Sequence, residues 1–176
     1  MLAIENLEAT GAVENYYPAS QGFTEVEESN FRLPEDLLEW VSPNLVAAWV
    51  EYETTRFACF DTASASASRM KNLLSVLSFS YAVAIYPSAR ISEECRTNPI
   101  LRNLCGGQTP FAHELWSTRR RCRRVLRGIL TEVFARALRH KAASEFRLTE
   151  SVQQGLESRV TERLDLARHM DTMDLE

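Results

Sequence analysis

The chain has 176 residues, of which 45% are hydrophobic, and a formal net charge of −4 at pH 7. This length and apolar content are enough for one packed domain with appended sequence, and no apolar run reaches the roughly 18 residues that a membrane-spanning helix needs. The acidic balance disfavours a nucleic-acid partner, but residues 86–141 hold 12 Lys/Arg against 4 Asp/Glu, a local charge of +8 that favours one.

Residues 1–30 are predicted to form a flexible acidic arm. The first 61 residues carry 12 acidic side chains against two arginines. We favour a solvated tail, and the alternative is an autoinhibitory arm that occupies the basic segment. Because this N-terminus lacks a basic region followed by an apolar one, a signal peptide is not expected, and we predict a cytoplasmic protein.

The cysteines and histidines are scattered along the chain, and no CxxC pair occurs. This spacing offers no zinc site, so no metal or other cofactor is expected. Buried, reduced thiols are the favoured interpretation for Cys59, Cys95, Cys105 and Cys122.

The pattern after the arm is helical. Pro34 suits a first helical position and is followed by two acidic residues, which predicts a short helix that ends at Ser42. Pro43 opens a second helix with apolar residues at three-to-four spacing. Residues 61–68 are small and polar, as in a loop or a frayed helix start. Residues 70–85 are apolar nearly all round and predict the central buried helix.

Two short helices with clear start and stop signals come next. Ser88 is expected to be the N-cap of a helix over residues 89–96. Another is predicted to start at Asn98-Pro99 and to end at Gly106-Gly107, because glycine commonly follows the last residue of a helix. These elements and the helix that follows them form a helix-turn-helix-like segment.

The following helix is predicted to run from Pro110 to about Lys141, because Gly128 alone need not break it. Projection at about 100° per residue divides this helix into an apolar face and a guanidinium face. Arg121 falls outside the guanidinium face. That face comprises Arg119, Arg120, Arg123, Arg124 and Arg127.

The six arginines between positions 119 and 127 repel one another and weaken their helix, so a neutralising partner is expected. Arginine suits bidentate contact with phosphate groups or guanine edges. One phosphate for each of these arginines would give a slope of about −5 for log affinity against log salt. The alternative, a solvated face with intramolecular partners, ranks below DNA.

Residues 142–176 are predicted to form an amphipathic C-terminal helix, whose outward residues alternate in sign from Glu157 to Arg163. Packing of this helix on its own domain is favoured, and a short intermolecular coiled coil is the alternative. Together these patterns predict an all-α fold, a compact multi-helix bundle with a helix-turn-helix-like segment and this amphipathic helix.

A series of motifs runs through the basic segment, of which Cys95-Arg96 and Gly106-Gly107-Gln108 are the most specific. With these motifs, residues 31–141 resemble the N-terminal domain of bacterial insertion-sequence transposases of the InsH type. The family usually has Asp, Phe and His where this chain has Phe111, Thr118 and Cys122. The residues that match in register are Tyr81-Ala82, Ser88, Arg90-Ile91, Glu94-Cys95-Arg96, Leu101-Arg102, Leu104, Gly106-Gly107-Gln108, Pro110 and Arg119-Arg120-Arg121.

The resemblance implies a helical domain that recognises the DNA at the ends of a mobile element and helps to assemble a transposase dimer. Such transposases continue into an RNase H-like domain, in which acidic residues hold two metal ions. Residues 142–176 instead show a helix pattern, and Asp165, Asp171 and Asp174 cannot reproduce that geometry. We therefore expect no catalysis. In this interpretation, Arg90, Arg96 and Arg102 add DNA contacts to those of the guanidinium face.

The predicted function is that of a transposase-derived DNA-binding protein without a catalytic domain, domesticated or truncated. Its expected partner is double-stranded DNA at element ends or regulatory sites. The expected location is the cytoplasm, where the protein could associate with the nucleoid. The alternative is a protein-interaction module that forms a homodimer or pairs with a full-length transposase, without DNA binding. A nuclease fragment that acts only with a second chain ranks last, and no membrane partner is expected.

Overall fold

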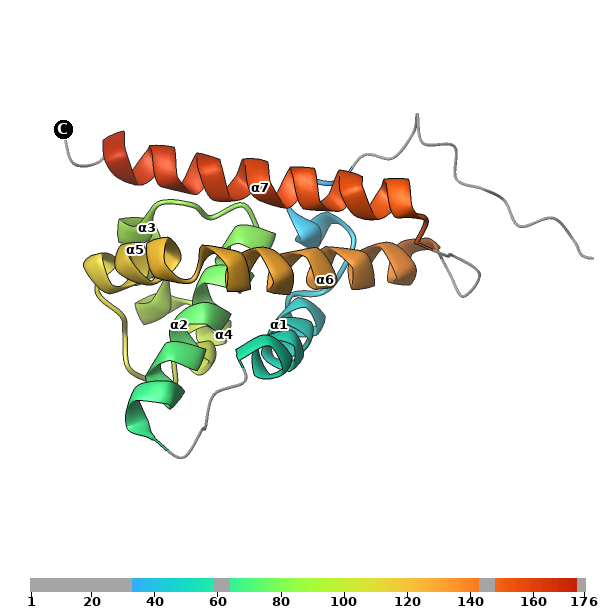
Figure 1. The fold of residues 1–176 in the computed structure, drawn as a ribbon. Helices are drawn as coiled ribbons and strands as arrows, with labels where there is room; N and C mark the ends of the chain where they lie inside the picture. The colour runs from blue at the N-terminus through green and yellow to red at the C-terminus, as the bar shows by residue number, and fades with distance from the viewer. Residues whose placement is uncertain (1–32, 59–63, 143–147, 174–176) are drawn as a thin grey trace, which may run out of the picture.

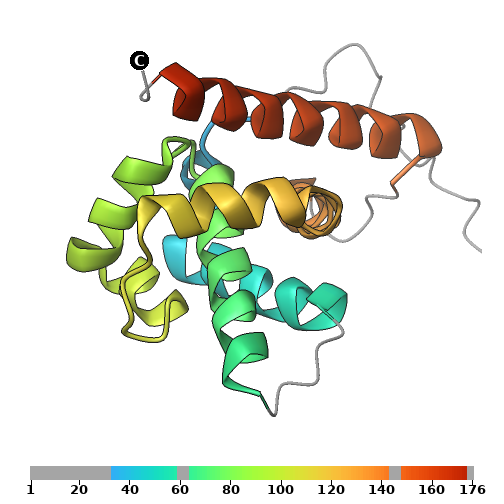
Figure 2. The ribbon, with the colours of Figure 1, turned by 60° about the vertical axis from the view of Figure 1, so that its left-hand side comes forward.

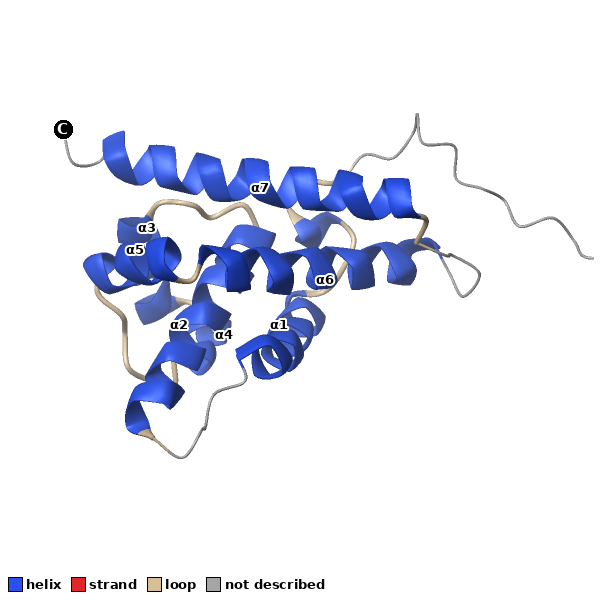
Figure 3. Ribbon diagram, viewed as in Figure 1, coloured by secondary structure: helices blue, strands red, loops and turns tan. Residues whose placement is uncertain are grey.

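The computed structural model describes residues 33–58, 64–142 and 148–173 (Figure 1). Every regular element in these ranges is a helix, which confirms the predicted all-α bundle (Figure 3). The predicted arm over residues 1–30 lies outside the described residues. The elements are the 3-10 helix η2 (Leu37–Glu39) and the α-helices α1 (Pro43–Ala58), α2 (Ala65–Ala82), α3 (Ser88–Thr97), α4 (Pro99–Leu104), α5 (Ala112–Arg121), α6 (Arg123–Ala142) and α7 (Glu150–Met173).

Helix α2 is the central buried helix that the sequence predicts. Residues 73–82 are all buried, and the helix packs against α1, α4, α5 and α6. It begins at Ala65, where the Oγ of Ser64 accepts a hydrogen bond from the Ala67 N–H at 3.1 Å. Residues 65–68, which the sequence predicts as part of a loop or a frayed helix start, therefore form the first turn of the core helix.

The C-terminal end of α2 turns back on itself with an alanine in the left-handed region. The Ile85 N–H donates to the Ser80 carbonyl at 2.8 Å, and Ala84 has a φ of 57°. This turn ends α2 at Ala82, which is earlier than the sequence predicts. Glycine is the usual residue at such a position, because it enters the left-handed region without steric cost.

Replacement of Ala84 by glycine is expected to raise the free energy of unfolding by about 0.5–1 kcal/mol, because the relief of backbone strain exceeds the added entropy of the unfolded chain. Urea denaturation measures the change. The matched control is Ala48→Gly at an exposed position in the interior of α1, which should lower stability by about 1 kcal/mol, since the backbone there is helical. A loss of stability in both variants would contradict the prediction.

Helix α4 starts and ends at the residues that the sequence indicates. The Oδ1 of Asn98 accepts hydrogen bonds from two backbone N–H groups of the first turn, at 3.0 and 3.3 Å. At the other end, Gly107 N–H donates to the Arg102 carbonyl at 3.0 Å and Gly106 N–H to the Asn103 carbonyl at 2.9 Å. Both glycines have positive φ values, 65° and 75°. These bonds form the Schellman motif, which ends the helix.

The first predicted helix is shorter than expected. The 3-10 helix η2 begins at Leu37 rather than at Pro34. Asp36 is its N-cap, because its Oδ1 accepts a hydrogen bond from the Leu38 N–H at 2.8 Å. The Asp36 side chain, which lies just before the helix, thus provides a hydrogen-bond acceptor for a free backbone N–H group of its first turn. Helix α1 then begins at Pro43, as predicted.

The single helix predicted over residues 110–141 is wrong, because the chain bends at Cys122. Helix α5 ends at Arg121 and α6 begins at Arg123. In Figure 2, α6 is seen nearly end-on while α5 lies across the view. Cys122 has φ −108° and ψ 21°, which departs from α-helical geometry. A projection of one straight helix is therefore not valid across this position.

Helix α7 packs against α6 at the outside of the bundle and crosses it, as the two views together show (Figures 1 and 2). This position confirms that the C-terminal helix packs on its own domain. None of the helices within the described ranges is long and apolar enough to cross a membrane. The apolar residues that α7 adds to the core are Val152, Leu156, Val160, Leu164 and Ala167.

Candidate nucleic-acid interface

Arg119 belongs to the core and not to an exposed face, since only 2% of it is accessible. Its Nη2 lies 2.5 Å from the Oδ2 of Asp171 in α7. Its Nη1 donates to the Ala167 carbonyl at 3.0 Å and to the Tyr81 hydroxyl at 3.4 Å. Burial raises the pKa of Tyr81 to about 12, so this hydroxyl is neutral beside the guanidinium. The prediction that Arg119 contacts DNA is therefore wrong, because its guanidinium is enclosed by α2 and α7.

Asp171 also contacts Ser88. The prediction that Ser88 is the N-cap of α3 is wrong, because Ser88 is the first residue of this helix. The N–H and the hydroxyl of Ser88 donate to the two carboxylate oxygens of Asp171, at 2.7 and 2.6 Å. A carboxylate at this end of a helix satisfies a free backbone donor and interacts favourably with the helix dipole. The cap of α3 thus comes from α7, and the same carboxylate pairs with Arg119.

Arg163 is a second buried guanidinium, with 9% of the residue exposed. Its Nη1 donates to the Tyr81 carbonyl at 2.9 Å, and its Nη2 donates to the Pro34 carbonyl. The guanidinium also lies 4.6 Å from the ring centroid of Phe134. It has no ion-pair partner within the described ranges. Burial lowers the pKa of this guanidinium.

The prediction that Arg163 faces outward on the C-terminal helix is wrong. A signal for its burial was present, since it follows the apolar positions Leu156 and Val160 at a spacing of seven and three residues. Residues at this spacing lie on one helix face. The prediction followed the alternation of charge along the helix instead of this apolar spacing, and so assigned Arg163 to the wrong face.

Four arginines are exposed around the α5–α6 bend, and we name them the arginine surface. Three come from the predicted guanidinium face, and Arg121, which the projection placed outside it, is exposed as well. The Arg120 guanidinium lies 4.8 Å from the ring centroid of Trp116. No carboxylate in the described part of the chain forms an ion pair with any of the four. The arginine surface comprises Arg120, Arg121, Arg124 and Arg127.

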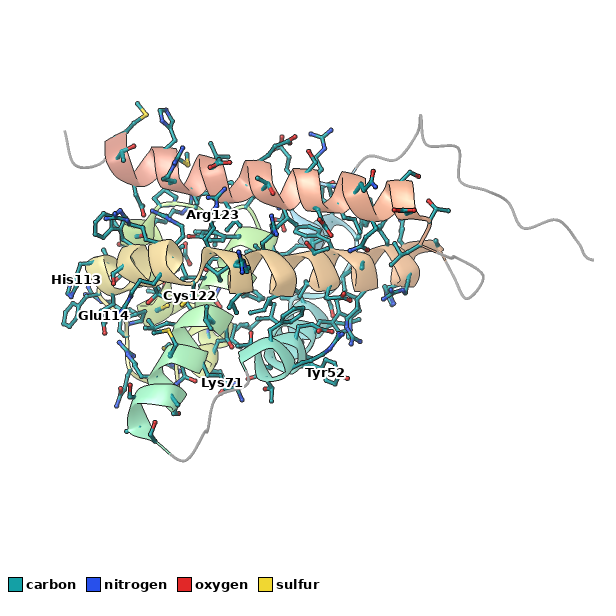
Figure 4. All side chains as sticks on the ribbon, in the orientation of Figure 1. Tyr52, Lys71, His113, Glu114, Cys122 and Arg123 are labelled. Carbon is teal, nitrogen blue, oxygen red and sulfur yellow. The ribbon has the colours of Figure 1, made fainter. Side chains whose placement is uncertain are left out.

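Arg123 is half-exposed and lies between the two longest helices of the bundle, α6 and α7 (Figure 4). Its Nη2 is 3.0 Å from the Oδ1 of Asp165, and that carboxylate is also 3.7 Å from the Nη2 of Arg168. Exposed pairs of this kind contribute about 0–1 kcal/mol. Arg123 is therefore partly neutralised within the protein, unlike the members of the arginine surface.

The other predicted DNA contacts are exposed on α3 and α4. The Nε of Arg90 lies 3.9 Å from the Oε1 of Glu94, one helical turn away. Arg96 and Arg102 have no ion-pair partner among the residues that the structure describes. No hydrogen bond or ion pair within those ranges joins these three arginines to the arginine surface.

The thiols are as expected where the structure describes them. Cys95 and Cys105 are buried, Cys122 is half-buried, and all three are free; Cys59 lies outside the described residues. Burial raises the pKa of Cys95 to about 12, and burial also raises that of Cys122, although Arg121 acts in the opposite direction. Raised thiol pKa values do not favour a reactive thiolate. Within the described ranges, no group of three or more His, Cys, Asp or Glu residues is placed to hold a metal ion.

No protein-family model, curated protein or solved structure matches this chain. The function is therefore inferred from the geometry of the arginines and from the motifs in the sequence.

Proposed function

We propose that this chain binds double-stranded DNA through the arginine surface, as a protein derived from the N-terminal domain of an insertion-sequence transposase. The main support is the presence of four exposed guanidinium groups within eight residues, none of which has a carboxylate partner in the described ranges. Like charges at this spacing repel one another. A row of DNA phosphates neutralises such charges and releases counterions from the DNA.

The other two arginines of the block show how this protein neutralises a guanidinium internally. Arg119 and Arg123 each have an aspartate partner on α7, at 2.5 and 3.0 Å. Helix α7 supplies no such partner to the arginine surface. Among the described residues, intramolecular ion pairs therefore neutralise two arginines of the block and none of the remaining four. The motif resemblance to transposase N-terminal domains supports DNA as the external partner.

Duplex DNA is expected to bind with a slope of log affinity against log salt of about −4, since about 0.9 counterions are released for each phosphate that the four arginines contact. Fluorescence anisotropy between roughly 50 and 200 mM salt measures this slope. The change Arg124→Ala should reduce its size by about 1, and the combined change of Arg120, Arg124 and Arg127 to alanine by about 3.

The matched control is Arg159→Ala, which removes an exposed arginine of α7 that pairs with Glu162 at 3.1 Å. This variant should bind DNA as the unmodified protein does. Circular dichroism of each variant establishes that the fold is retained. Binding that does not depend on salt, or that the triple variant leaves unchanged, would contradict the proposal.

A further inference from the structure

An aromatic groove lies beside the arginine surface, between the N-terminal ends of α3 and α5. It is lined by Phe111, His113 and Trp116 at the start of α5, by Ser88 and Ala89 of α3, and by Asp171 of α7. Its volume is about 610 Å³ and its walls are mostly apolar. This volume is within the range of sites that enclose small, flat organic groups.

Two rings of the groove, those of Phe111 and His113, are exposed to solvent, and Trp116 is half-buried. Phe111 is 63% exposed, and its ring is stacked on that of His113, with centroids 5.7 Å apart and planes 12° apart. His113 lies at the outer edge of the molecule (Figure 4). Contiguous exposed apolar surface of this kind commonly marks a binding site.

The charge around the groove favours an anionic ligand. Its one acidic side chain, Asp171, is already neutralised by Arg119 and by the two hydrogen bonds from Ser88. The helix ends that border the groove are both capped, α3 by Asp171 and α5 by the Glu114 carboxylate, which accepts a hydrogen bond from the Phe111 N–H at 2.8 Å, so the positive charge beside the groove is that of Arg120. The Arg120 guanidinium lies over Trp116, 4.8 Å from its ring centroid. Exposed rings beside arginines are the combination that stacks unpaired bases while it neutralises phosphates.

We propose that this aromatic groove binds unpaired bases of DNA next to a duplex held by the arginine surface. The inference rests on the proposed function and makes it more specific. It assigns the phosphates to the arginines and the bases to Phe111, His113 and Trp116. The preferred ligand is therefore a DNA junction, a duplex that continues into a short single strand, which should bind more tightly than a continuous duplex.

The test compares a blunt duplex with the same duplex that carries a short single-stranded overhang, by fluorescence anisotropy at one salt concentration. The unmodified protein should bind the overhang DNA at least about fivefold more tightly, as expected for a base that stacks on an aromatic side chain. Phe111→Ala, at an exposed position, should remove this preference and leave binding to the blunt duplex unchanged. Trp116→Leu is a second variant that should remove the preference; its affinity for the blunt duplex is not a control, because the ring contacts the Arg120 guanidinium of the arginine surface. Tyr52→Ala, at another exposed ring, should keep the preference.

The outcomes separate the two proposals. Equal affinity for the two DNAs overturns the inference about the groove and leaves the proposed function intact, whereas absence of binding to either DNA overturns both. A third outcome concerns a protein ligand. If Phe111→Ala converts a dimer into a monomer in light scattering and no overhang preference exists, the groove is an interface between copies of this chain, and the inference is wrong.

Discussion

Replacement of Asp171 by alanine is expected to lower the free energy of unfolding by about 3–5 kcal/mol, the usual cost of removing one member of a buried ion pair. The residue is 5% exposed. Its carboxylate accepts two hydrogen bonds from Ser88 and lies 2.5 Å from the Arg119 guanidinium. The variant would leave a buried positive charge alone and α3 without its cap. Since domains are commonly stable by about 5–15 kcal/mol, urea denaturation should show a large shift of the midpoint.

A second aspartate of α7 provides the control for this prediction. Asp165 also pairs with an arginine of the 119–127 block, but its side chain and that of Arg123 are 46% and 40% exposed. The change Asp165→Ala should therefore cost about 1 kcal/mol or less. Adding Arg119→Met to Asp171→Ala should recover part of the loss, because no buried charge then remains unpaired. Equal losses for the two aspartate variants would contradict the buried ion pair.

Local signals predicted the fold wherever the deciding residues are neighbours in the sequence. Asn98 starts α4 and Gly106 ends it through hydrogen bonds that span only a few residues. The uniformly apolar run likewise predicted the central helix. The cap of α3 could not be predicted in this way, because the carboxylate that satisfies Ser88 is 83 residues further along the chain.

The candidate site was predicted only in part, for the same physical reason. The arginine block is visible in the sequence, but the exposure of each arginine depends on where α7 supplies a carboxylate. The bend at Cys122 added a second error, since no glycine or proline between Pro110 and Gly128 signals it. As a result, Arg119 lies in the core although it was predicted to be exposed, and Arg121 is exposed although it was predicted to lie outside the guanidinium face.

Replacement of Arg163 by methionine is expected to lower the free energy of unfolding by about 2–4 kcal/mol. Two carbonyl groups, those of Tyr81 and Pro34, would lose hydrogen bonds from a charged donor, and bonds of this type are worth about 1.5–3 kcal/mol each. The Tyr81 carbonyl lies in the last turn of α2, where helical N–H donors are no longer available. Methionine retains much of the side-chain volume, so the loss reports the guanidinium and not a cavity.

The competing effect is the cost of keeping the Arg163 guanidinium away from water, and the measurement decides which effect is larger. An isolated buried ion pair is often replaced by apolar residues without loss, because both charges leave together. Here both partners are backbone carbonyls, which stay buried when the guanidinium is removed, so the loss of their hydrogen bonds should dominate. Hydrogen exchange at residues 35–38 should quicken as well, since the Pro34 contact fixes that segment to α7. The control is Arg159→Met at an exposed position, which should change neither the stability nor the exchange rates. If Arg163→Met is as stable as the unmodified protein, the cost of dehydrating the guanidinium is the larger effect.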